Sequence, residues 1–177
     1  MWRLAVSIVV LSFAGIASPA THVAPPPKRP PVDCHDADHR AIGFWVGAWS
    51  VIDTGSSTPI ADSRIEWMYD GCAIRETYTQ TVGPGGKPVD YRGSSYTALN
   101  NGDHTWRQFY IDSTGGAFSY TGDLNDATLT LTTRTASVTN RMTIKAQADG
   151  SVRQSGEIST DGGKTWSPGY DFTYRRK

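Results

Sequence analysis

The chain has 177 residues, of which 17 are Lys or Arg and 17 are Asp or Glu, so its formal net charge at pH 7 is zero. A protein without excess positive charge lacks the surface potential that attracts nucleic acids or anionic membranes, and the composition therefore argues against both as partners. The length is sufficient for one domain with a proper hydrophobic core.

Residues 1–20 have the layout of a secretory signal peptide. Met1-Trp2-Arg3 supplies positive charge, residues 4–16 are almost wholly apolar, and small residues end the segment at Ala20. The apolar run is shorter than the stretch of about 20 residues that crosses a bilayer. We expect cleavage after Ala20, or alternatively after Ala17. The mature protein should then be exported, periplasmic or secreted, with no integral membrane segment.

A Pro-rich linker and a short helix are expected before the first strand. Residues 21–32 contain five prolines, which continue neither a helix nor a central strand, so this linker should be extended. The folded domain is then expected to span residues 33–177. At its start, the stretch "DCHDADHRAI" (Asp33–Ile42) predicts one short helix with Asp33 or Asp36 as its N-cap.

Cys34 and Cys72 are the two cysteines of the chain. An exported protein meets an oxidising compartment, so this pair predicts one disulfide. The bond would join the segment before the first strand to the turn after the second. The alternative is a pair of buried free thiols.

Regular turn signals from Phe44 onward predict an all-β domain. Pairs such as Asn-Gly, Asp-Gly and Gly-Gly recur roughly every 10 to 17 residues. The segments between them, such as "TWRQFYID" and "ATLTLTTR", are rich in β-branched and aromatic residues. About ten strands in one small domain form either a sandwich or a closed barrel. The short connections favour an up-and-down antiparallel barrel of about eight to ten strands, which has room for one small ligand.

The segment "GFWVGAWSV", residues 43–51, resembles the opening strand of lipocalin-like barrels, which place a Gly-x-Trp near the barrel floor. Together with "GCAIRETYT", "WRQFYID", "RMTI", "DGSVRQSGEISTDGGKTW" and "YDFTYRRK", it resembles a bacterial family of exported lipocalin-like proteins of unknown function. The resemblance runs from about His39 to the C-terminus. It implies a calycin-type β-barrel, but it transfers no catalytic residue.

The stretch "STDGGKTW" (Ser159–Trp166) matches the Asp-box pattern of sialidases. A sialidase propeller repeats this unit in blades of about 40 residues, and this chain carries one copy. Asp161 can accept hydrogen bonds from its own turn, Gly162 and Gly163 permit positive φ, and Trp166 can pack on the core side. We interpret the motif as a well-formed hairpin and not as evidence for glycan cleavage.

The stretch "TWRQFYID" mixes aromatic rings with polar groups on one face. Trp106, Gln108 and Tyr110 alternate with Arg107, Phe109 and Ile111. We expect the first set to face the barrel interior, because Tyr and Trp suit a partly wet cavity. Gln108 can donate and accept, so it can orient a ligand without burying a charge. Rings combined with a few polar groups are typical of a small-molecule pocket.

The leading hypothesis is a non-enzymatic barrel that binds a small, partly apolar molecule. An inward Arg141 beside Glu76 would form a buried ion pair or a clamp for an anionic ligand. Trp49 should lie near the floor. The candidate ligand-binding residues are Trp49, Glu76, Tyr78, Tyr96, Trp106, Gln108, Tyr110 and Arg141.

Two other functions remain open at this point. Glu76 or Asp112 could serve as the catalytic carboxylate of a hydrolase or isomerase-type enzyme within the same cavity. Alternatively, the side chains fill the barrel completely and the protein has a structural or interaction role. An open cavity would argue against the solid barrel, and a strongly raised carboxylate pKa beside it would favour the enzyme.

The sequence gives no basis for a metal or cofactor site. His35, Asp36, Asp38 and His39 are residue types that bind metals, but the acidic residues are equally explained as charges at a helix N-terminus. Haem needs an axial histidine on an inward-facing strand, and His104, the one histidine of the strand region, falls in a predicted turn. Motifs of serine hydrolases, zinc proteases and phosphate-binding loops do not occur. We therefore assign no metal ligand, cofactor or catalytic residue.

Overall fold

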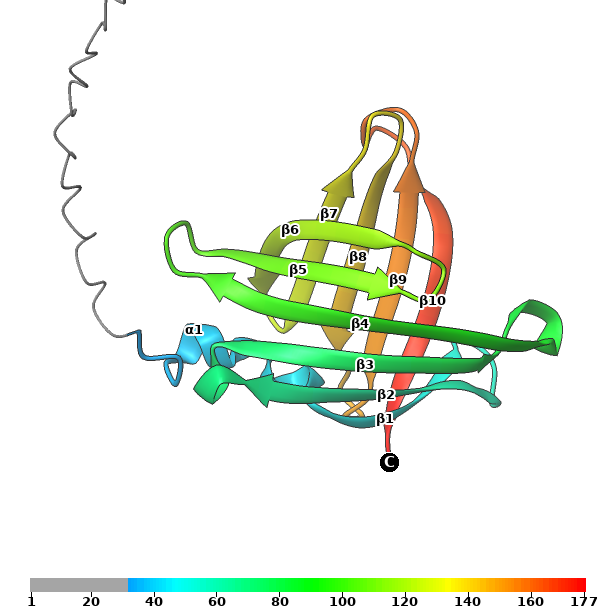
Figure 1. The fold of residues 1–177 in the computed structure, drawn as a ribbon, viewed down its shortest axis with the longest axis horizontal. Helices are drawn as coiled ribbons and strands as arrows, with labels where there is room; N and C mark the ends of the chain where they lie inside the picture. Colours follow the sequence, from blue (N-terminus) through cyan, green and yellow to red (C-terminus); the bar gives the residue numbers. More distant parts are fainter. Residues whose placement is uncertain (1–31) are drawn as a thin grey trace, which may run out of the picture. The chain divides into compact units, whose positions relative to one another are not determined.

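Residues 32–177 are described by the computed structural model, and they fold into a closed antiparallel barrel of ten strands (Figure 1). The expected signal peptide at residues 1–20 and all of the expected linker except Val32 lie outside the described residues. Within residues 32–177, no helix is long and apolar enough to cross a membrane.

A short helical segment precedes the barrel strands. It consists of α1 (Ala37–Arg40) and the 3₁₀ helix η1 (Ala41–Trp45), and two further 3₁₀ turns, η2 (Tyr69–Gly71) and η3 (Pro84–Gly86), lie between strands. The strands are β1 (Gly47–Asp53), β2 (Pro59–Met68), β3 (Ala73–Val82), β4 (Pro88–Asn100), β5 (Thr105–Asp112), β6 (Ala117–Asn125), β7 (Thr128–Arg134), β8 (Thr139–Ala146), β9 (Val152–Ser159) and β10 (Ser167–Arg176).

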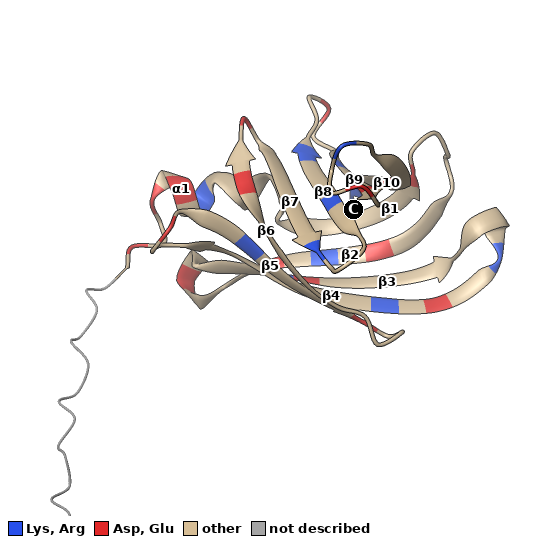
Figure 2. Cartoon of the chain, turned by 90° about the horizontal axis from the view of Figure 1, so that it is seen from above, with Lys and Arg blue, Asp and Glu red and all other residues tan. Residues whose placement is uncertain are grey.

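The barrel has up-and-down topology. Each strand pairs with the next along the chain, and β1 pairs with β10 to close the ring. Strands β2–β5 run crosswise to β7–β10 in Figure 1. The all-β fold, the antiparallel meander and the preceding short helix are thus confirmed, with a strand number at the upper end of the predicted range. Acidic and basic residues are interspersed along the strands and turns (Figure 2).

The first strand begins later than its sequence suggests. The stretch from Gly43 to Trp45 was expected to open the strand, but it belongs to η1, and β1 starts at Gly47. A 3₁₀ helix has three residues per turn, so Ile42 and Trp45 lie on the same side of it. Both side chains are buried in the hydrophobic core. The 3₁₀ helix therefore directs both Ile42 and Trp45 into the end of the barrel, whereas a strand would have directed them to opposite faces.

Trp49 lies at the closed end of the barrel, as expected. Its Nε1 donates to the Trp45 carbonyl at 2.9 Å. The rings of Trp45 and Trp49 each form a T-shaped contact with the Tyr174 ring, with centroid separations of 6.3 and 6.4 Å. The Arg176 guanidinium lies 4.4 Å from the Trp49 ring centroid, and a Cβ at Gly47 would come within 2.6 Å of Arg176 Nη1. Gly47 thus leaves the space in which Arg176 covers the floor tryptophan.

The helix N-cap is Asp36, one of the two predicted caps. Its carboxylate accepts from the His39 backbone N–H at 2.9 Å and also contacts His39 Nδ1 at 2.8 Å. Asp33 instead accepts from the His35 backbone N–H at 3.0 Å, so it stabilises the turn before the helix. These contacts use the acidic residues of the "DCHDADH" stretch to order the helix start.

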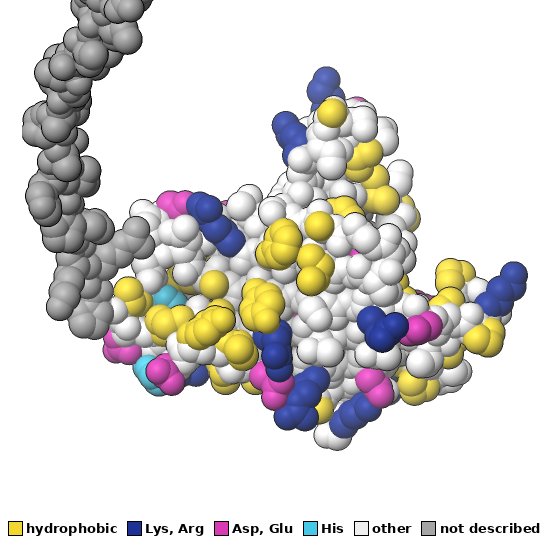
Figure 3. Space-filling view, viewed as in Figure 1, with side chains coloured by type: hydrophobic (Ala, Val, Ile, Leu, Met, Phe, Trp, Pro, Cys, Tyr) yellow, Lys and Arg dark blue, Asp and Glu magenta, His cyan; other side chains and the backbone are white. Residues whose placement is uncertain are grey.

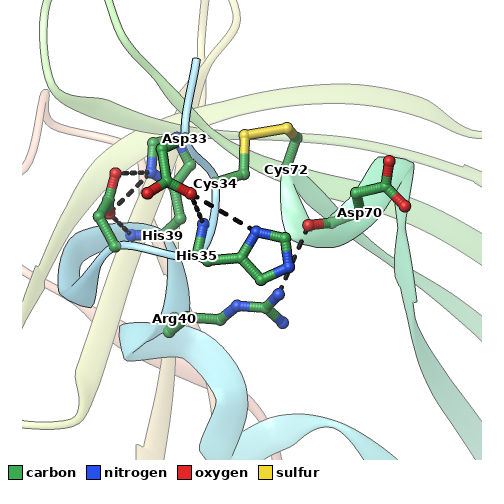
Figure 4. The surroundings of a disulfide bond; sticks show 8 residues. Asp33, Cys34, His35, His39, Arg40, Asp70 and Cys72 are labelled. Carbon is green, nitrogen blue, oxygen red and sulfur yellow. Dashed lines mark hydrogen bonds and ion pairs between the residues drawn. A yellow bond between two sulfur atoms is a disulfide. The ribbon is translucent and has the colours of Figure 1, made fainter. Parts of the chain in front are cut away.

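Cys34 and Cys72 form the predicted disulfide, with their Cα atoms 4.8 Å apart (Figure 4). The bond joins the segment before α1 to the turn between β2 and β3. Close by, Arg40 Nη2 donates to the Asp70 carbonyl at 3.4 Å, which links the same two segments a second time. The disulfide and this hydrogen bond both tie the helical segment to the turn between β2 and β3.

We predict that removing this disulfide destabilises the fold. Closing a loop of 38 residues restricts the unfolded chain, so Cys34→Ser/Cys72→Ser should lower the free energy of unfolding by about 3 kcal/mol. Urea denaturation with and without reductant measures the difference. Reductant should destabilise the parent to the same extent and leave the double variant unchanged. A parent whose transition does not respond to complete reduction would contradict this account.

The Asp-box motif forms the turn between β9 and β10, as predicted. Asp161 accepts hydrogen bonds from the backbone N–H groups of Lys164 and Thr165, both at 2.9 Å. The Thr165 and Ser159 hydroxyls also donate to it, at 2.6 and 2.8 Å. These hydrogen bonds lower the pKa of Asp161 well below its ordinary value, because they stabilise the ionised form. The motif is a hydrogen-bonded turn, as the sequence indicated.

Trp166 differs from expectation, because it packs outside the barrel and not on its core side. Its Nε1 donates to the Gly163 carbonyl at 3.1 Å, and its ring lies 4.0 Å from the Arg141 guanidinium carbon. Arg141 sits on the outer face of β8, and stacking on it explains why the ring lies there.

We predict that Asp161→Ala lowers the melting temperature by several degrees, because the backbone N–H groups of Lys164 and Thr165 lose their hydrogen-bond acceptor. Thermal unfolding followed by far-UV circular dichroism tests this. Thr160→Ala, at an exposed neighbouring position, is the matched control and should leave the transition unchanged. Equal transitions for both variants would mean that the motif has no structural role.

Candidate functional site

The barrel interior contains a cavity of about 390 Å³, which begins at Tyr174 and extends away from the floor tryptophans. This volume lies at the small end of the range for ligand pockets, roughly 300–1,000 Å³. The lining combines aromatic rings, glutamine amides and two carboxyl groups. The residues are Glu76, Tyr78, Gln80, Tyr91, Gln108, Tyr110, Asp112, Phe118, Tyr120, Met142, Gln154, Tyr170, Phe172 and Tyr174.

Strand β5 presents the expected face to the interior. Trp106 and Gln108 are buried, at 5% and 4% exposure, whereas Phe109 and Ile111 are 50% and 47% exposed. Gln108 and Tyr110 line the cavity. The predicted orientation of this strand is therefore confirmed. Whether these side chains bind a ligand stays a prediction.

Trp106 faces inward but lies outside the cavity lining. Its position pairs with Gly122 of β6, one inward position further toward the closed end than Gln108. With Leu99 and His104 it lines a separate, polar depression of about 300 Å³. Trp49 is also outside the lining, because it belongs to the floor contacts with Trp45 and Tyr174. The two tryptophans thus form part of the packed lower half of the barrel.

Glu76 is a carboxyl group buried at the bottom of the cavity. Ser63 Oγ of β2 donates to its Oε1 at 2.8 Å, and the Tyr174 hydroxyl of β10 lies 3.3 Å from the same oxygen. Burial raises the pKa of Glu76 to about 7, because a low-dielectric surrounding penalises the charged form. Hydrogen bonds from Ser63, Tyr174 and Ser95 act in the opposite direction and are outweighed.

A network of polar side chains surrounds this acid. Tyr174 donates to Gln154 Oε1 at 2.5 Å, and Gln154 Nε2 lies 2.9 Å from Met142 Sδ. Gln108 Nε2 donates to Thr97 Oγ1 at 2.9 Å. These contacts fix the side-chain orientations before any ligand enters, which lowers the conformational cost of binding.

A second network orders the cavity mouth. The Tyr91 and Tyr110 hydroxyls are 2.5 Å apart, and Tyr91 donates to Asp112 Oδ2 at 3.3 Å. The other Asp112 oxygen accepts from the Thr114 hydroxyl at 2.6 Å and from the backbone N–H groups of Thr114 and Gly116 at 2.8 and 3.1 Å. These hydrogen bonds hold the pKa of Asp112 below its ordinary value, led by the Thr114 hydroxyl. Asp112 is therefore ionised at neutral pH.

Two glycines let tyrosine rings lie flat against the barrel wall. A Cβ at Gly93 of β4 would come within 2.1 Å of the Tyr110 hydroxyl oxygen. A Cβ at Gly156 of β9 would come within 2.2 Å of Cε1 of Tyr170, its cross-strand partner. Each ring thus occupies the space of a missing side chain on the neighbouring strand. The cavity stays open because these rings do not project across it.

Tyr96 was expected to complete the lining, and this expectation is wrong. Its neighbours Ser95 and Thr97 are buried, so the pleat turns Tyr96 to the outside, where it is 45% exposed. There it pairs across strands with Phe109. Figure 3 shows that hydrophobic side chains lie on the outer surface of the protein, and both of these residues are exposed there.

Arg141 also faces outward, which corrects the expectation of an inward arginine. It forms an ion pair with Glu157 of β9 at 2.8 Å and stacks on Trp166. Met142 and Ile144 are the buried residues of this part of β8. Arg141 therefore does not lie beside Glu76 and cannot serve there as a clamp for an anionic ligand.

Several lining residues were not among the candidates taken from the sequence. They are Gln80, Tyr91, Phe118, Tyr120, Met142, Tyr170, Phe172 and Tyr174. Strand β10 carried a readable signal, because Tyr170, Phe172 and Tyr174 recur at every second residue and so share one face.

The stretch with metal-binding residue types serves a structural purpose. His39 Nδ1 is held by the Asp36 carboxylate, as described for the helix cap. Within residues 32–177, His, Cys, Asp and Glu side chains do not gather in groups of three or more that could hold a metal ion.

Comparisons of the sequence with protein-family models and with curated proteins find no match. The closed ten-stranded antiparallel barrel is compatible with a lipocalin-like fold. Membership of the exported bacterial family that the chain resembles stays a prediction.

The raised pKa of Glu76 predicts a dependence of stability on pH. The folded chain holds this proton up to about pH 7, whereas the ordinary pKa is 4.5. The contribution of the group to stability is therefore fully present below pH 4.5 and is lost as pH rises through about 7. Glu76→Gln mimics the neutral acid, so it should match the parent near pH 4 and exceed its free energy of unfolding by about 3 kcal/mol at pH 8.

Urea denaturation at a series of pH values measures this difference. The control is Glu66→Gln on the outer face of β2, where the carboxylate pairs with Arg64 and Arg75 and its pKa is lowered. This variant should gain no stability at pH 8. If Glu76→Gln and the parent were equally stable from pH 4 to pH 8, the carboxyl group would have to be solvated in the folded chain.

Proposed function

We propose that this protein is an exported barrel that binds a small, partly apolar molecule in its interior. The observation that carries the proposal is the cavity of about 390 Å³, lined by eight aromatic rings and a few oriented polar groups. Apolar walls supply affinity through burial of the ligand surface, and the polar groups supply orientation and selectivity.

The lining side chains are held in place by contacts with one another. This supports a binding site and argues against a packing defect. Tyr78 and Tyr91 meet edge to face with centroids 6.2 Å apart, and Tyr170 and Phe172 stack at 5.0 Å. Rings held by their neighbours lose little freedom when a ligand arrives. The same cavity argues against a solid barrel with a purely structural role.

The proposal of export draws on the sequence at residues 1–20 and on the disulfide. Cys34 and Cys72 are joined, and such bonds persist in oxidising compartments. A periplasmic or secreted protein with an internal pocket is suited to carrying, storing or sensing a small molecule.

One observation favours an enzyme as a second candidate. Glu76 lines the cavity, and its pKa of about 7 suits a group that both takes and gives a proton at neutral pH. Asp112 fits this task less well, since its pKa is lowered and it lies at the mouth. Among the described residues that line the cavity, Glu76 has no histidine, lysine or cysteine as a catalytic partner. Binding without turnover therefore stays the leading proposal.

The binding proposal predicts that the cavity takes up the neutral fluorescent probe N-phenyl-1-naphthylamine. Tyr110→Ala removes a ring from the lining and should weaken probe affinity about tenfold, because aromatic contact and buried area are both lost. Phe109→Ala, the adjacent residue on the outer face of the same strand, is the matched control and should change affinity less than about twofold.

Fluorescence titration gives the dissociation constants, and circular dichroism checks that both variants are folded. Native mass spectrometry of the exported protein adds an independent test, in which a retained small molecule should appear as a mass increment. Equal effects of the two substitutions would place the probe on the outer surface and would count against the cavity. Turnover of a retained compound by the parent, abolished in Glu76→Gln, would instead establish the enzyme.

A further inference from the structure

The cavity lining carries negative charge and no positive charge. Glu76 and Asp112 are its ionisable carboxyl groups, and no Lys, Arg or His is among the described residues that line it. The basic side chains of the neighbouring strands are held outside by ion pairs, as in Arg75 with Glu66 and Arg141 with Glu157. A ligand that enters therefore meets no group that would compensate an anion.

The hydrogen-bond donors of the tyrosine lining are largely used within the protein. Tyr78 donates to Gln80 Oε1 at 3.1 Å, Tyr91 donates to Asp112, and Tyr174 donates to Gln154. Because the Tyr91 proton points to Asp112, Tyr110 is the donor in its 2.5 Å contact with Tyr91. A tyrosine whose proton is committed offers a ligand only its oxygen lone pairs and its ring face.

The glutamine amides follow the same pattern. Their Nε2 atoms lie against acceptors of the protein, with Gln80 on the Val82 carbonyl at 2.7 Å and Gln108 on Thr97 Oγ1. Gln154 Nε2 contacts Met142 Sδ. The lining is thus rich in acceptors that remain able to receive a proton, and among its six tyrosines Tyr120 and Tyr170 are the ones whose hydroxyls donate to no other described residue.

The aromatic rings add to this preference. Eight Tyr and Phe rings line the cavity, and the face of such a ring carries negative electrostatic potential. Cations are attracted to ring faces, and the attraction is strongest where water is excluded. A quaternary ammonium or protonated amine is the ligand chemistry that such a box selects.

We propose that the ligand of this cavity is a small organic cation, an alkylated or protonated amine carried on an apolar or aromatic body. The inference deepens the proposed binding function and rests on it. The apolar body contacts the rings, and the ammonium group lies near Glu76 at the floor or Asp112 at the mouth. The interior volume of about 390 Å³ limits the ligand to a compact molecule.

Three probes of nearly equal shape test the sign of the charge. Benzyltrimethylammonium is the cation, neopentylbenzene is its neutral isostere, and phenylmethanesulfonate is an anion of similar size. Isothermal titration calorimetry at pH 8 with the full exported protein measures all three, with competition against N-phenyl-1-naphthylamine for the poorly soluble hydrocarbon. We expect the cation to bind at least tenfold more tightly than the hydrocarbon, and the sulfonate to bind most weakly.

Carboxyl variants then separate charge from shape. In the double variant Glu76→Gln/Asp112→Asn, the preference for the cation over the hydrocarbon should fall below about threefold. The single variants identify which end of the cavity holds the ammonium group. Glu66→Gln removes a carboxylate from the outer face and should leave the preference unchanged.

The outcomes distinguish this inference from the function on which it rests. Equal affinity for cation and hydrocarbon, or preference for the sulfonate, overturns the cationic ligand while the hydrocarbon still demonstrates binding in the cavity. A cation preference that survives the double carboxyl variant also overturns it. Failure of all three probes and of N-phenyl-1-naphthylamine to bind overturns both proposals.

Discussion

The pairing of β1 with β10 is the constraint on which the rest of the structure depends. It closes ten strands into a ring and places Tyr174 of β10 opposite Val51, directly above the floor tryptophans. Below Tyr174, large apolar side chains fill the interior. On the other side of Tyr174, large apolar side chains do not fill the interior, and polar and aromatic groups line the cavity. Tyr174 serves both halves, because its ring packs on Trp45 and Trp49 while its hydroxyl joins the network of Gln154 and Glu76.

The burial of Glu76 beside the cavity lowers the stability of the folded chain near neutral pH. A glutamine or an apolar residue at this position would avoid the unfavourable burial of a charge near neutral pH, and Ser63 and Ser95 offset only part of that penalty. Proteins retain such departures from optimal stability mainly where a function uses them. The buried acid is for this reason stronger evidence for a working cavity than the volume alone. It also distinguishes this interior from the floor, where the large buried groups are apolar or aromatic.

The sequence predicted the barrel and the facing of β5, because both follow from local patterns. Turn signals at short intervals are enough for a meander, and Trp106, Gln108 and Tyr110 differ clearly from the set that contains Arg107. Arg141 and Tyr96 could not be placed in this way. Their outward partners, Glu157 with Trp166 and Phe109, come from other strands, and only the register brings them together. The 3₁₀ conformation of Gly43–Trp45 was also beyond local reasoning, since the burial of Trp45 depends on the floor that β10 completes.

The glycines beneath Tyr110 and Tyr170 give the cavity an unusual determinant of size. Lining residues usually set the shape of a pocket directly, but here Gly93 and Gly156 set it from behind, through the rings that rest on them. Any larger residue at either position would collide with the ring that rests on it and would displace that ring toward the interior. Related barrels could therefore acquire narrower or wider selectivity by exchanging residues in the wall while every contacting side chain stays the same. A search for specificity determinants confined to the contact surface would overlook both positions.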